Sequence, residues 1–139
     1  MSSSPRAVVI GHGEFAAGLV SAVEQISGMG QLLLPLTTTD LAGSGIETMV
    51  RERLESTGLR IVFTDLPGGS ATMAVRRLQR SLPDLTIVSG TNLPLLLEFL
   101  NRAGNGQSGA EGGGGGDAAL AALERGRAAM LVFRGTLAG

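Results

Sequence analysis

Four short apolar runs, each followed by a stretch with helical periodicity, constrain the fold of this chain more than any other feature. The runs are rich in Val, Ile, Leu or Phe, are closed by Gly, Thr or Asp, and cover residues 6–11, 31–36, 59–65 and 85–90. Continuous apolar segments of this length are typical of strands that are buried on both faces of a parallel sheet. The sequence therefore predicts four buried strands.

The stretches between these runs predict amphipathic helices. Residues 15–26 place four apolar side chains on one face, namely Phe15, Leu19, Val23 and Ile26. Comparable patterns occur in residues 46–56, 70–82 and 93–102. Strands that alternate with helices define an α/β fold with right-handed crossovers. We expect a three-layer sandwich in which helices cover both faces of a central, mostly parallel sheet.

The chain is expected to form one domain. Its 139 residues can bury a single core and leave no room for separate cofactor and substrate domains. Residues 1–102 form the main body, and the Gly-rich residues 103–116 are expected to be a flexible linker. Residues 117–139 complete the same domain with a helix capped by Asp117 and a last strand within 128–133. A strand on so loose a tether can be exchanged with a second copy of the chain.

Composition excludes several classes of function. The formal net charge is -1 and all 11 basic residues are Arg, spread along the sequence, so neither nucleic-acid binding nor a polybasic membrane patch is expected. The lack of Cys removes thiol chemistry, the lack of Lys removes a Walker-type loop, and one His does not suffice for the usual metal cluster. No metal or cofactor is expected. No segment reaches the length of a signal peptide or membrane span, so we expect a cytoplasmic protein.

The carboxyl ends of the predicted strands gather the reactive residue types. In open α/β sheets, ligands bind outside these ends, where several loops converge. His12, the single histidine, follows the first strand, and Asp65 follows the third. A carboxylate that accepts a hydrogen bond from one imidazole nitrogen fixes the tautomer and leaves the other nitrogen as a nucleophile. His12 and Asp65 are therefore candidate catalytic residues.

The segment after Asp65 predicts a phosphate-binding loop. Gly68 and Gly69 let backbone N–H groups approach an anion closely, and Ser70 adds a hydroxyl at the start of a helix. The helix dipole favours negative charge there by about 0.3 to 1 kcal/mol. Phosphoryl transfer depends mostly on positioning and charge stabilisation, so the pattern indicates reversible phosphorylation of His12 without a metal ion. Ser70 is thus a candidate for both catalysis and phosphate binding.

Each of these residues also has a purely structural interpretation. A lone histidine after a strand is commonly a solvated loop residue, and Asp65 or Ser70 can simply cap the following helix. Thr91 and Asn92, after the fourth strand, are interpreted as turn residues. Three arginines of the third helix form a solvated face or else meet an acidic partner, namely Arg76, Arg77 and Arg80.

Three spaced motifs resemble the enzyme IIA domain of the mannose-type bacterial phosphotransferase system, particularly its galactosamine and N-acetylgalactosamine relatives. They are VIGHGEFAAGL, FTDLPGGS and SGTNLPLLLEFL, so the resemblance runs from Ala7 to about Arg102, with a weaker echo in ALERGR. It implies that His12 accepts a phosphoryl group from the phosphocarrier protein HPr and passes it to a IIB component, which phosphorylates sugar. Asp65 matches the aspartate that orients the histidine, and Ser70 matches the hydroxyl residue that supports the phosphoryl group.

The resemblance further implies a phosphotransferase component that forms a homodimer and meets the membrane only indirectly, through permease subunits. Its fold is expected to be completed by an antiparallel C-terminal strand exchanged across the dimer. Two features depart from the family. Ala71 and Thr72 stand where Pro-Phe usually follows the GGS or GGT motif, which predicts a different rim towards partner proteins, and the Gly-rich tract is longer than expected.

Three alternatives share parts of this pattern. Residues 11–16 also fit the G-x-G-x-x-A dinucleotide-binding fingerprint, but His12 would occupy the path of the pyrophosphate. A phosphocarrier domain of dihydroxyacetone kinases shares the fold and the histidine chemistry, although the GTNLPLLLEFL segment favours the mannose type. The main alternative is a regulatory IIA-like protein that HPr phosphorylates on His12 but that binds a regulatory partner instead of serving sugar transport.

Overall fold

A computed structural model of the chain describes residues 4–104 and 114–136. Its centre is a four-stranded sheet with the order β2-β1-β3-β4, in which every neighbouring pair is parallel. The strands are β1 (Ala7–Gly11), β2 (Leu33–Thr37), β3 (Ile61–Thr64) and β4 (Thr86–Ser89). The four strands predicted from the apolar runs are confirmed, with small shifts at their ends.

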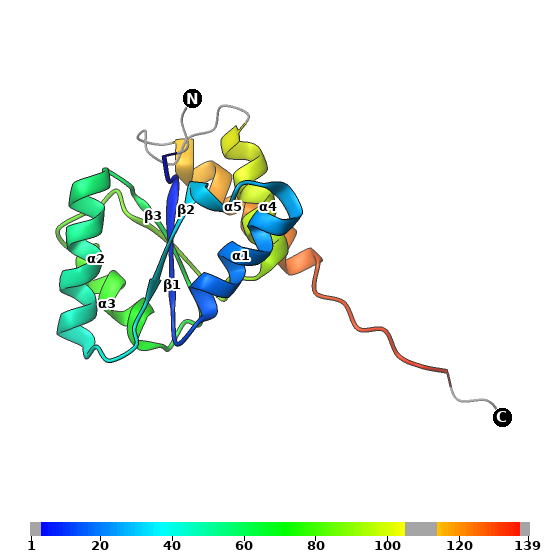
Figure 1. The fold of residues 1–139 in the computed structure, drawn as a ribbon, viewed down its shortest axis with the longest axis horizontal. Helices are drawn as coiled ribbons and strands as arrows, with labels where there is room; N and C mark the ends of the chain where they lie inside the picture. Colours follow the sequence, from blue (N-terminus) through cyan, green and yellow to red (C-terminus); the bar gives the residue numbers. More distant parts are fainter. Residues whose placement is uncertain (1–3, 105–113, 137–139) are drawn as a thin grey trace.

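Helices cover both faces of the sheet, so the predicted three-layer sandwich is confirmed (Figure 1). One face carries α1 (Phe15–Ser27), α4 (Leu93–Gly104) and α5 (Gly114–Ala128), and the other carries α2 (Gly43–Thr57) and α3 (Ser70–Leu78). A short 3-10 helix, η1 (Gly30–Leu32), leads into β2. Among the described residues, no helix is long and apolar enough to cross a membrane.

Successive residues of the central strands serve two separate layers of core. In β1, Val9 packs towards α1 and α4, whereas Val8 and Ile10 pack towards α2 and α3, as the two-residue period of a strand requires. Phe63 of β3 meets Phe99 of α4 edge-to-face, with ring centroids 5.0 Å apart. Burial on both faces explains why these strands are continuous apolar runs and not alternating ones.

The two edges of the sheet differ. The edge strand β2 contains Pro35, which has no N–H group and is tolerated because β2 is paired on one side only. The opposite edge strand, β4, carries ordinary backbone donors and acceptors, and in the described part of the chain no strand pairs with its outer side. β4 also contacts α5, the helix that precedes the C-terminal segment, so this open edge is a place where that segment could pair.

In the C-terminal region, the bounds of two helices differ from the prediction. α5 begins at Gly114, so Asp117 does not cap this helix but lies in its first turn. The helix dipole favours a carboxylate in that turn. Residues 103–104 belong to α4 and 114–116 to α5, and the rest of the expected linker lies outside the described residues. In the single chain, residues 130–136 follow α5 as an exposed tail and form no strand (Figure 1), so the expected strand within 128–133, exchanged with a second copy, stays a prediction.

One predicted core position is wrong. The side chain of Ile26 is 60% exposed, whereas Val23 of the same helix is fully buried. Three residues advance an α-helix by about 300°, which turns Ile26 roughly 60° away from Val23. It also lies in the last turn of α1, where no other element of residues 4–104 and 114–136 covers it.

Candidate functional site

The order of the strands places two candidate residues at a crevice. The chain leaves β1 for α1 on one face of the sheet and leaves β3 for α3 on the other face. Where adjacent strands diverge in this way, a crevice opens outside their carboxyl ends, and α/β proteins bind ligands there. His12 follows β1 and Asp65 follows β3, and these two strands are hydrogen-bonded neighbours.

His12 and Asp65 share two short contacts to one carboxylate oxygen. Nδ1 of His12 lies 2.7 Å from Oδ2 of Asp65, and the backbone N–H of His12 donates to the same oxygen over 2.9 Å. The imidazole is 57% exposed, whereas the Asp65 side chain is only 9% exposed. Because Nδ1 faces a carboxylate, it carries the proton of the neutral ring, and Nε2 keeps its lone pair. The structure thus brings these two predicted residues together.

Asp65 is held as an anion by its hydrogen bonds. Burial raises the pKa of its carboxyl group, but hydrogen bonds from the His12 side chain, the His12 backbone and the Leu66 N–H outweigh burial and lower that pKa below its ordinary value. The Leu66 N–H donates to Oδ1 over 2.9 Å, while His12 occupies Oδ2. Both carboxylate oxygens are therefore fixed.

Gly11, directly before His12, makes room for the carboxylate. A methyl group at this position would lie 2.9 Å from Oδ2 of Asp65 and 2.6 Å from Cδ2 of Phe15. Both distances are shorter than van der Waals contact, so a side chain here would push Asp65 away from the imidazole. This role goes beyond the sequence-based prediction, and the signal that points to it is a glycine placed between a buried strand and the histidine.

The end of β2 supports the histidine loop. Thr37 donates its hydroxyl to the carbonyl of Gly13 over 2.8 Å, and Oγ1 of Thr39 lies 2.8 Å from that of Thr37. On the other side of the turn, the N–H of Phe15 donates to the carbonyl of His12 over 3.1 Å. The backbone around the imidazole is thereby restrained from both sides.

The segment Gly68-Gly69-Ser70 borders the imidazole. Gly69 is the N-cap of α3, and a methyl group there would lie 3.4 Å from Cε1 of His12. The first turn of α3, with its unpaired N–H groups and positive dipole end, therefore begins beside the ring. Among the described residues, neither Asp65 nor Ser70 caps α3 through its side chain, which removes that structural interpretation. The exposed hydroxyl of Ser70 has no hydrogen bond to His12 in this part of the chain.

Three hydroxyl groups, those of the buried Thr64 and Thr72 and of the half-buried Ser89, form a cluster beneath the site that the sequence patterns do not predict. Oγ1 of Thr72 lies 2.7 Å from Oγ1 of Thr64 and 2.7 Å from the carbonyl of Leu66, and Oγ1 of Thr64 lies 2.8 Å from Oγ of Ser89. Thr72 is 4% exposed and its neighbour Ala71 is fully buried. The two positions where Pro-Phe is usual therefore lie in the interior of this chain, and the predicted difference at the rim stays a prediction.

Two further groups of candidate residues serve the fold. Oδ1 of Asn92 accepts the N–H of Leu95, and its Nδ2 donates to the carbonyl of Gly126, each over 3.0 Å, so Asn92 joins the start of α4 to α5. This agrees with its interpretation as a turn residue. On α3, Arg77 donates to Glu47 of α2 over 2.8 Å and lowers the pKa of that carboxyl group.

Several solved structures share the fold of this chain. The fold superposes on phosphotransferase system component EIIA from Streptococcus agalactiae with a TM-score of 0.77 at 18% identity, over 91% of this chain and 95% of that chain. It also matches the mannose/sorbose-specific IIA subunit from Enterococcus faecalis, with a TM-score of 0.72 at 20% identity, over 98% and 99%. A IIA protein associated with the fucose utilization operon of Streptococcus pneumoniae gives a TM-score of 0.65 at 24% identity, over 95% and 96%. The fold is that of phosphotransferase-system IIA components.

A family profile gives the particular assignment. Residues 6–111 match the EIIA-man family, which is described as the fructose IIA component of the phosphotransferase system. Because the match spans most of the chain, the chain belongs to this family and is a sugar phosphotransferase system IIA component. Comparison with curated proteins gives no match. The resemblance drawn from the three motifs is confirmed.

Proposed function

We propose that the chain is a phosphoryl carrier of the cytoplasm, which accepts a phosphoryl group from HPr on Nε2 of His12 and passes it to a IIB component. The observation that carries this proposal is the 2.7 Å contact between Nδ1 of His12 and Oδ2 of Asp65. It leaves Nε2 unprotonated on a side chain that is more than half exposed, where another protein can reach it.

The transfer step needs few groups. The lone pair of Nε2 attacks phosphorus while the bond from phosphorus to the donor atom breaks, and the electron pair of that bond stays on the donor. The ring keeps its proton on Nδ1 and becomes cationic, and the adjacent Asp65 carboxylate stabilises this charge. Transfer to IIB reverses the same step, with Nε2 as the leaving group.

The Gly68-Gly69-Ser70 loop is proposed to hold the oxygens of the phosphoryl group. Its place beside Cε1 of His12 supports this role, because Nε2 is bonded to Cε1 and a phosphoryl group on Nε2 would face the start of α3. The helix N-terminus supplies N–H donors and a favourable dipole, and the exposed Ser70 hydroxyl can turn towards an oxygen. The phosphoryl group would then lie between a cationic ring and a positive helix end.

We also propose that two copies of the chain form a homodimer by exchanging their C-terminal tails. Met130, Leu131, Val132 and Phe133 are 72%, 66%, 83% and 90% exposed, and a contiguous apolar segment of this kind marks an interaction site. The outer side of β4 offers unpaired backbone groups to an added strand. An antiparallel strand formed by residues 130–133 of a second copy would pair with β4 and bury the apolar side chains of that segment.

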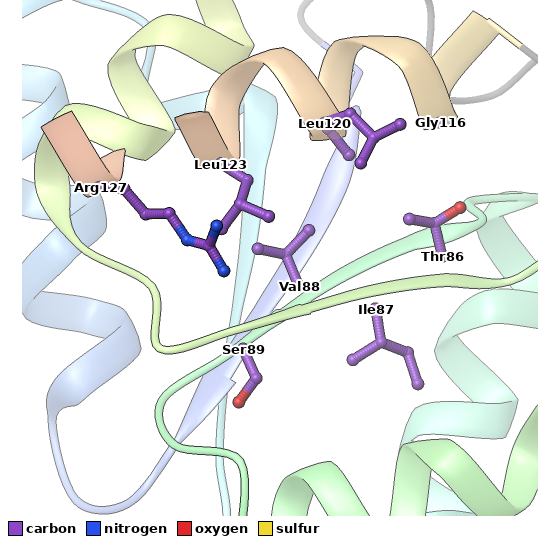
Figure 2. Close-up of a pocket in the computed structure, with 9 residues that line it drawn as sticks. Thr86, Ile87, Val88, Ser89, Gly116, Leu120, Leu123 and Arg127 are labelled. Carbon is purple, nitrogen blue, oxygen red and sulfur yellow. The ribbon is translucent and has the colours of Figure 1, made fainter. Parts of the chain in front are cut away.

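A groove beside β4 supports this position for the tail. It has a volume of about 240 Å³ and lies between β4 and α5. Figure 2 shows Val88 of β4 and Leu123 of α5 pointing into it, with the guanidinium of Arg127 at one end. Side chains on one face of an added strand can fill such a groove while the strand backbone pairs with β4.

Intact-mass spectrometry tests the phosphoryl-carrier proposal. The protein is incubated with phosphoenolpyruvate, enzyme I and HPr, and its mass is measured before and after acid treatment. We expect one acid-labile phosphoryl group that is absent from a folded His12→Ala variant, because N-phosphohistidine hydrolyses in acid and phosphoserine does not. Loss of the group upon adding IIB would establish the second half of the transfer.

An acid-stable modification, or phosphorylation that persists in His12→Ala, would refute His12 as the acceptor. The HPr of the same organism is the appropriate donor, since docking of a foreign HPr is a separate requirement. Circular dichroism of His12→Ala provides the folding control, because the exposed imidazole contributes little to the core.

A further inference from the structure

The segment between Asp65 and α3 lacks an apolar anchor of its own. Leu66 is 46% exposed, so its side chain does not fix the loop in the core. The Asp65 carboxylate nevertheless has to keep one orientation, since its two oxygens serve different donors. Backbone hydrogen bonds must therefore hold Leu66 in place.

Leu66 is held at both of its peptide groups. Its N–H donates to Oδ1 of Asp65 over 2.9 Å. Its carbonyl accepts the hydroxyl of Thr72 over 2.7 Å and, more weakly, the N–H of Gly69 over 3.2 Å. Thr72 is 4% exposed and belongs to the first turn of α3, so its hydroxyl is a fixed point to which the loop is tied.

The Thr72 hydroxyl has two acceptors at 2.7 Å, the carbonyl of Leu66 and Oγ1 of Thr64. A hydroxyl group has one proton, and the carbonyl of Leu66 can only accept. When Thr72 donates to Leu66, its oxygen can accept the hydroxyl of Ser89 at 3.3 Å, and the oxygen of Ser89 in turn accepts the hydroxyl of Thr64 over 2.8 Å. Linked hydroxyls that are largely shielded from water polarise and strengthen one another, so the cluster favours the Thr72 to Leu66 bond.

We propose that Thr72, supported by Thr64 and Ser89, is a positioning residue that sets the orientation of the Asp65 carboxylate towards Nδ1 of His12. The path runs from the Thr72 hydroxyl to the Leu66 carbonyl, from the Leu66 N–H to Oδ1 of Asp65, and from Oδ2 of Asp65 to Nδ1 of His12. Its consequence for phosphoryl transfer rests on the proposed function, whereas its effect on the imidazole does not.

The tautomer of His12 gives a direct test, because the chain contains a single histidine and its ring nitrogens give unambiguous NMR signals. The ¹⁵N shifts of Nδ1 and Nε2 in the neutral ring report which nitrogen carries the proton. In Thr72→Val, which removes the hydroxyl but keeps the shape, we expect a larger Nε2–H population than in the wild type. Thr72→Ser keeps the hydroxyl and should restore the wild-type shifts.

Thr91→Val is the matched control. Thr91 is buried to a similar degree, and its hydroxyl reaches only the carbonyl of Val88, at 3.5 Å, in the part of the chain that the structure describes. We expect its His12 signals to match the wild type. Unchanged ¹⁵N shifts in folded Thr72→Val, or equal changes in Thr91→Val, would overturn the proposal. Should Thr72→Val not fold, Ser89→Ala takes its place, with a smaller shift expected in the same direction and an absent shift counting against the cluster.

Kinetics separate this proposal from the carrier function. Misplacing a reacting group can lower a rate by up to about a hundredfold. We therefore expect the rate constant for phosphoryl transfer from HPr, measured at saturating HPr, to fall roughly tenfold in Thr72→Val and to recover in Thr72→Ser. If the wild type accepts no phosphoryl group, the carrier proposal fails while the tautomer result still decides the role of Thr72. An altered tautomer with an unchanged transfer rate would show that the path exists but does not limit transfer, and would overturn its role in positioning for the reaction.

Discussion

His12 and Asp65 are joined through the side chain and the backbone of the histidine at once, since Nδ1 and the main-chain N–H both reach Oδ2 of the carboxylate, at 2.7 and 2.9 Å. The second oxygen, Oδ1, accepts the N–H of Leu66. All three donors point at a group that has only acceptors. The pairing of His12 and Asp65 therefore requires a charged group with two acceptor oxygens, and a side chain of the same shape without them would not suffice.

Asp65→Asn should slow phosphoryl acceptance roughly 100-fold while the fold and the dimer persist. An amide has one acceptor oxygen, so its NH₂ group must face either His12 or the N–H of Leu66, and donor then meets donor. The ring loses its fixed tautomer or the loop loses its anchor. Rapid-quench measurement of acceptance from HPr gives the rate.

Glu47→Gln is the control for this substitution. It also replaces a carboxylate whose pKa is lowered, in this case by a hydrogen bond from Arg77, but it lies on α2 and does not contact His12. Its transfer rate should match the wild type. Equal rates for Asp65→Asn and the wild type would remove Asp65 from the site.

Gly11→Ala should impair the site and destabilise the fold by about 1 to 3 kcal/mol, the usual cost of overpacking. The added methyl group would lie 2.6 Å from Phe15 and 2.9 Å from Asp65. Gly18→Ala is the matched variant, because nothing lies within 4 Å of a methyl group there and the residue is inside α1. It should raise the free energy of unfolding by about 0.5 to 1 kcal/mol and leave transfer unchanged. Urea unfolding that showed no difference between the two would contradict this account.

The strands and the layers could be predicted from the sequence because burial on both faces leaves a continuous apolar run, as around Val8 and Val9. The burial of Ile26 was predicted wrongly because helical periodicity gives the direction of a side chain but does not show whether another element covers that end of the helix. The C-terminal segment was not decided by pattern either. Residues 128–133 have the composition of a strand, but a strand forms only where a sheet edge is within reach, and in the single chain this segment leads away from the sheet.

The site divides in the same way. His12 and Asp65 are recognisable by residue type at the ends of buried strands, and topology alone brings them together. The roles of Gly11 and Thr72 were not predicted, since they depend on distances of a few ångströms to groups in other elements and loops. Threonine in a first helical turn usually indicates nothing more than a cap, whereas Thr72 turns inward to the carbonyl of Leu66.

Asp65 should also make stability depend on pH at the acid side. Its pKa in the folded chain is lowered from the ordinary value of 3.8, so its contribution to stability is present above that value and is lost as the pH falls through the lower folded-state pKa. The difference in unfolding free energy between the wild type and Asp65→Asn should therefore be constant near neutrality and shrink in acid. Urea titrations from about pH 6 to about pH 3 measure it. A difference that grew in acid would reverse the sign and contradict the hydrogen-bonded carboxylate.

The exchanged-tail dimer predicts that Leu131→Asp combined with Phe133→Asp yields a monomer. Residues two apart lie on the same face of a strand, so both aspartates would point into the groove beside β4. Burial of two carboxylates there would be unfavourable. Sedimentation equilibrium of the wild type should give a dimer at micromolar concentration, and the double variant should give a folded monomer. Removal of residues 134–139 is the control and should leave the dimer intact, since Met130 to Phe133 remain. A monomeric wild type, or a dimer that tolerates both aspartates, would rule out the exchange.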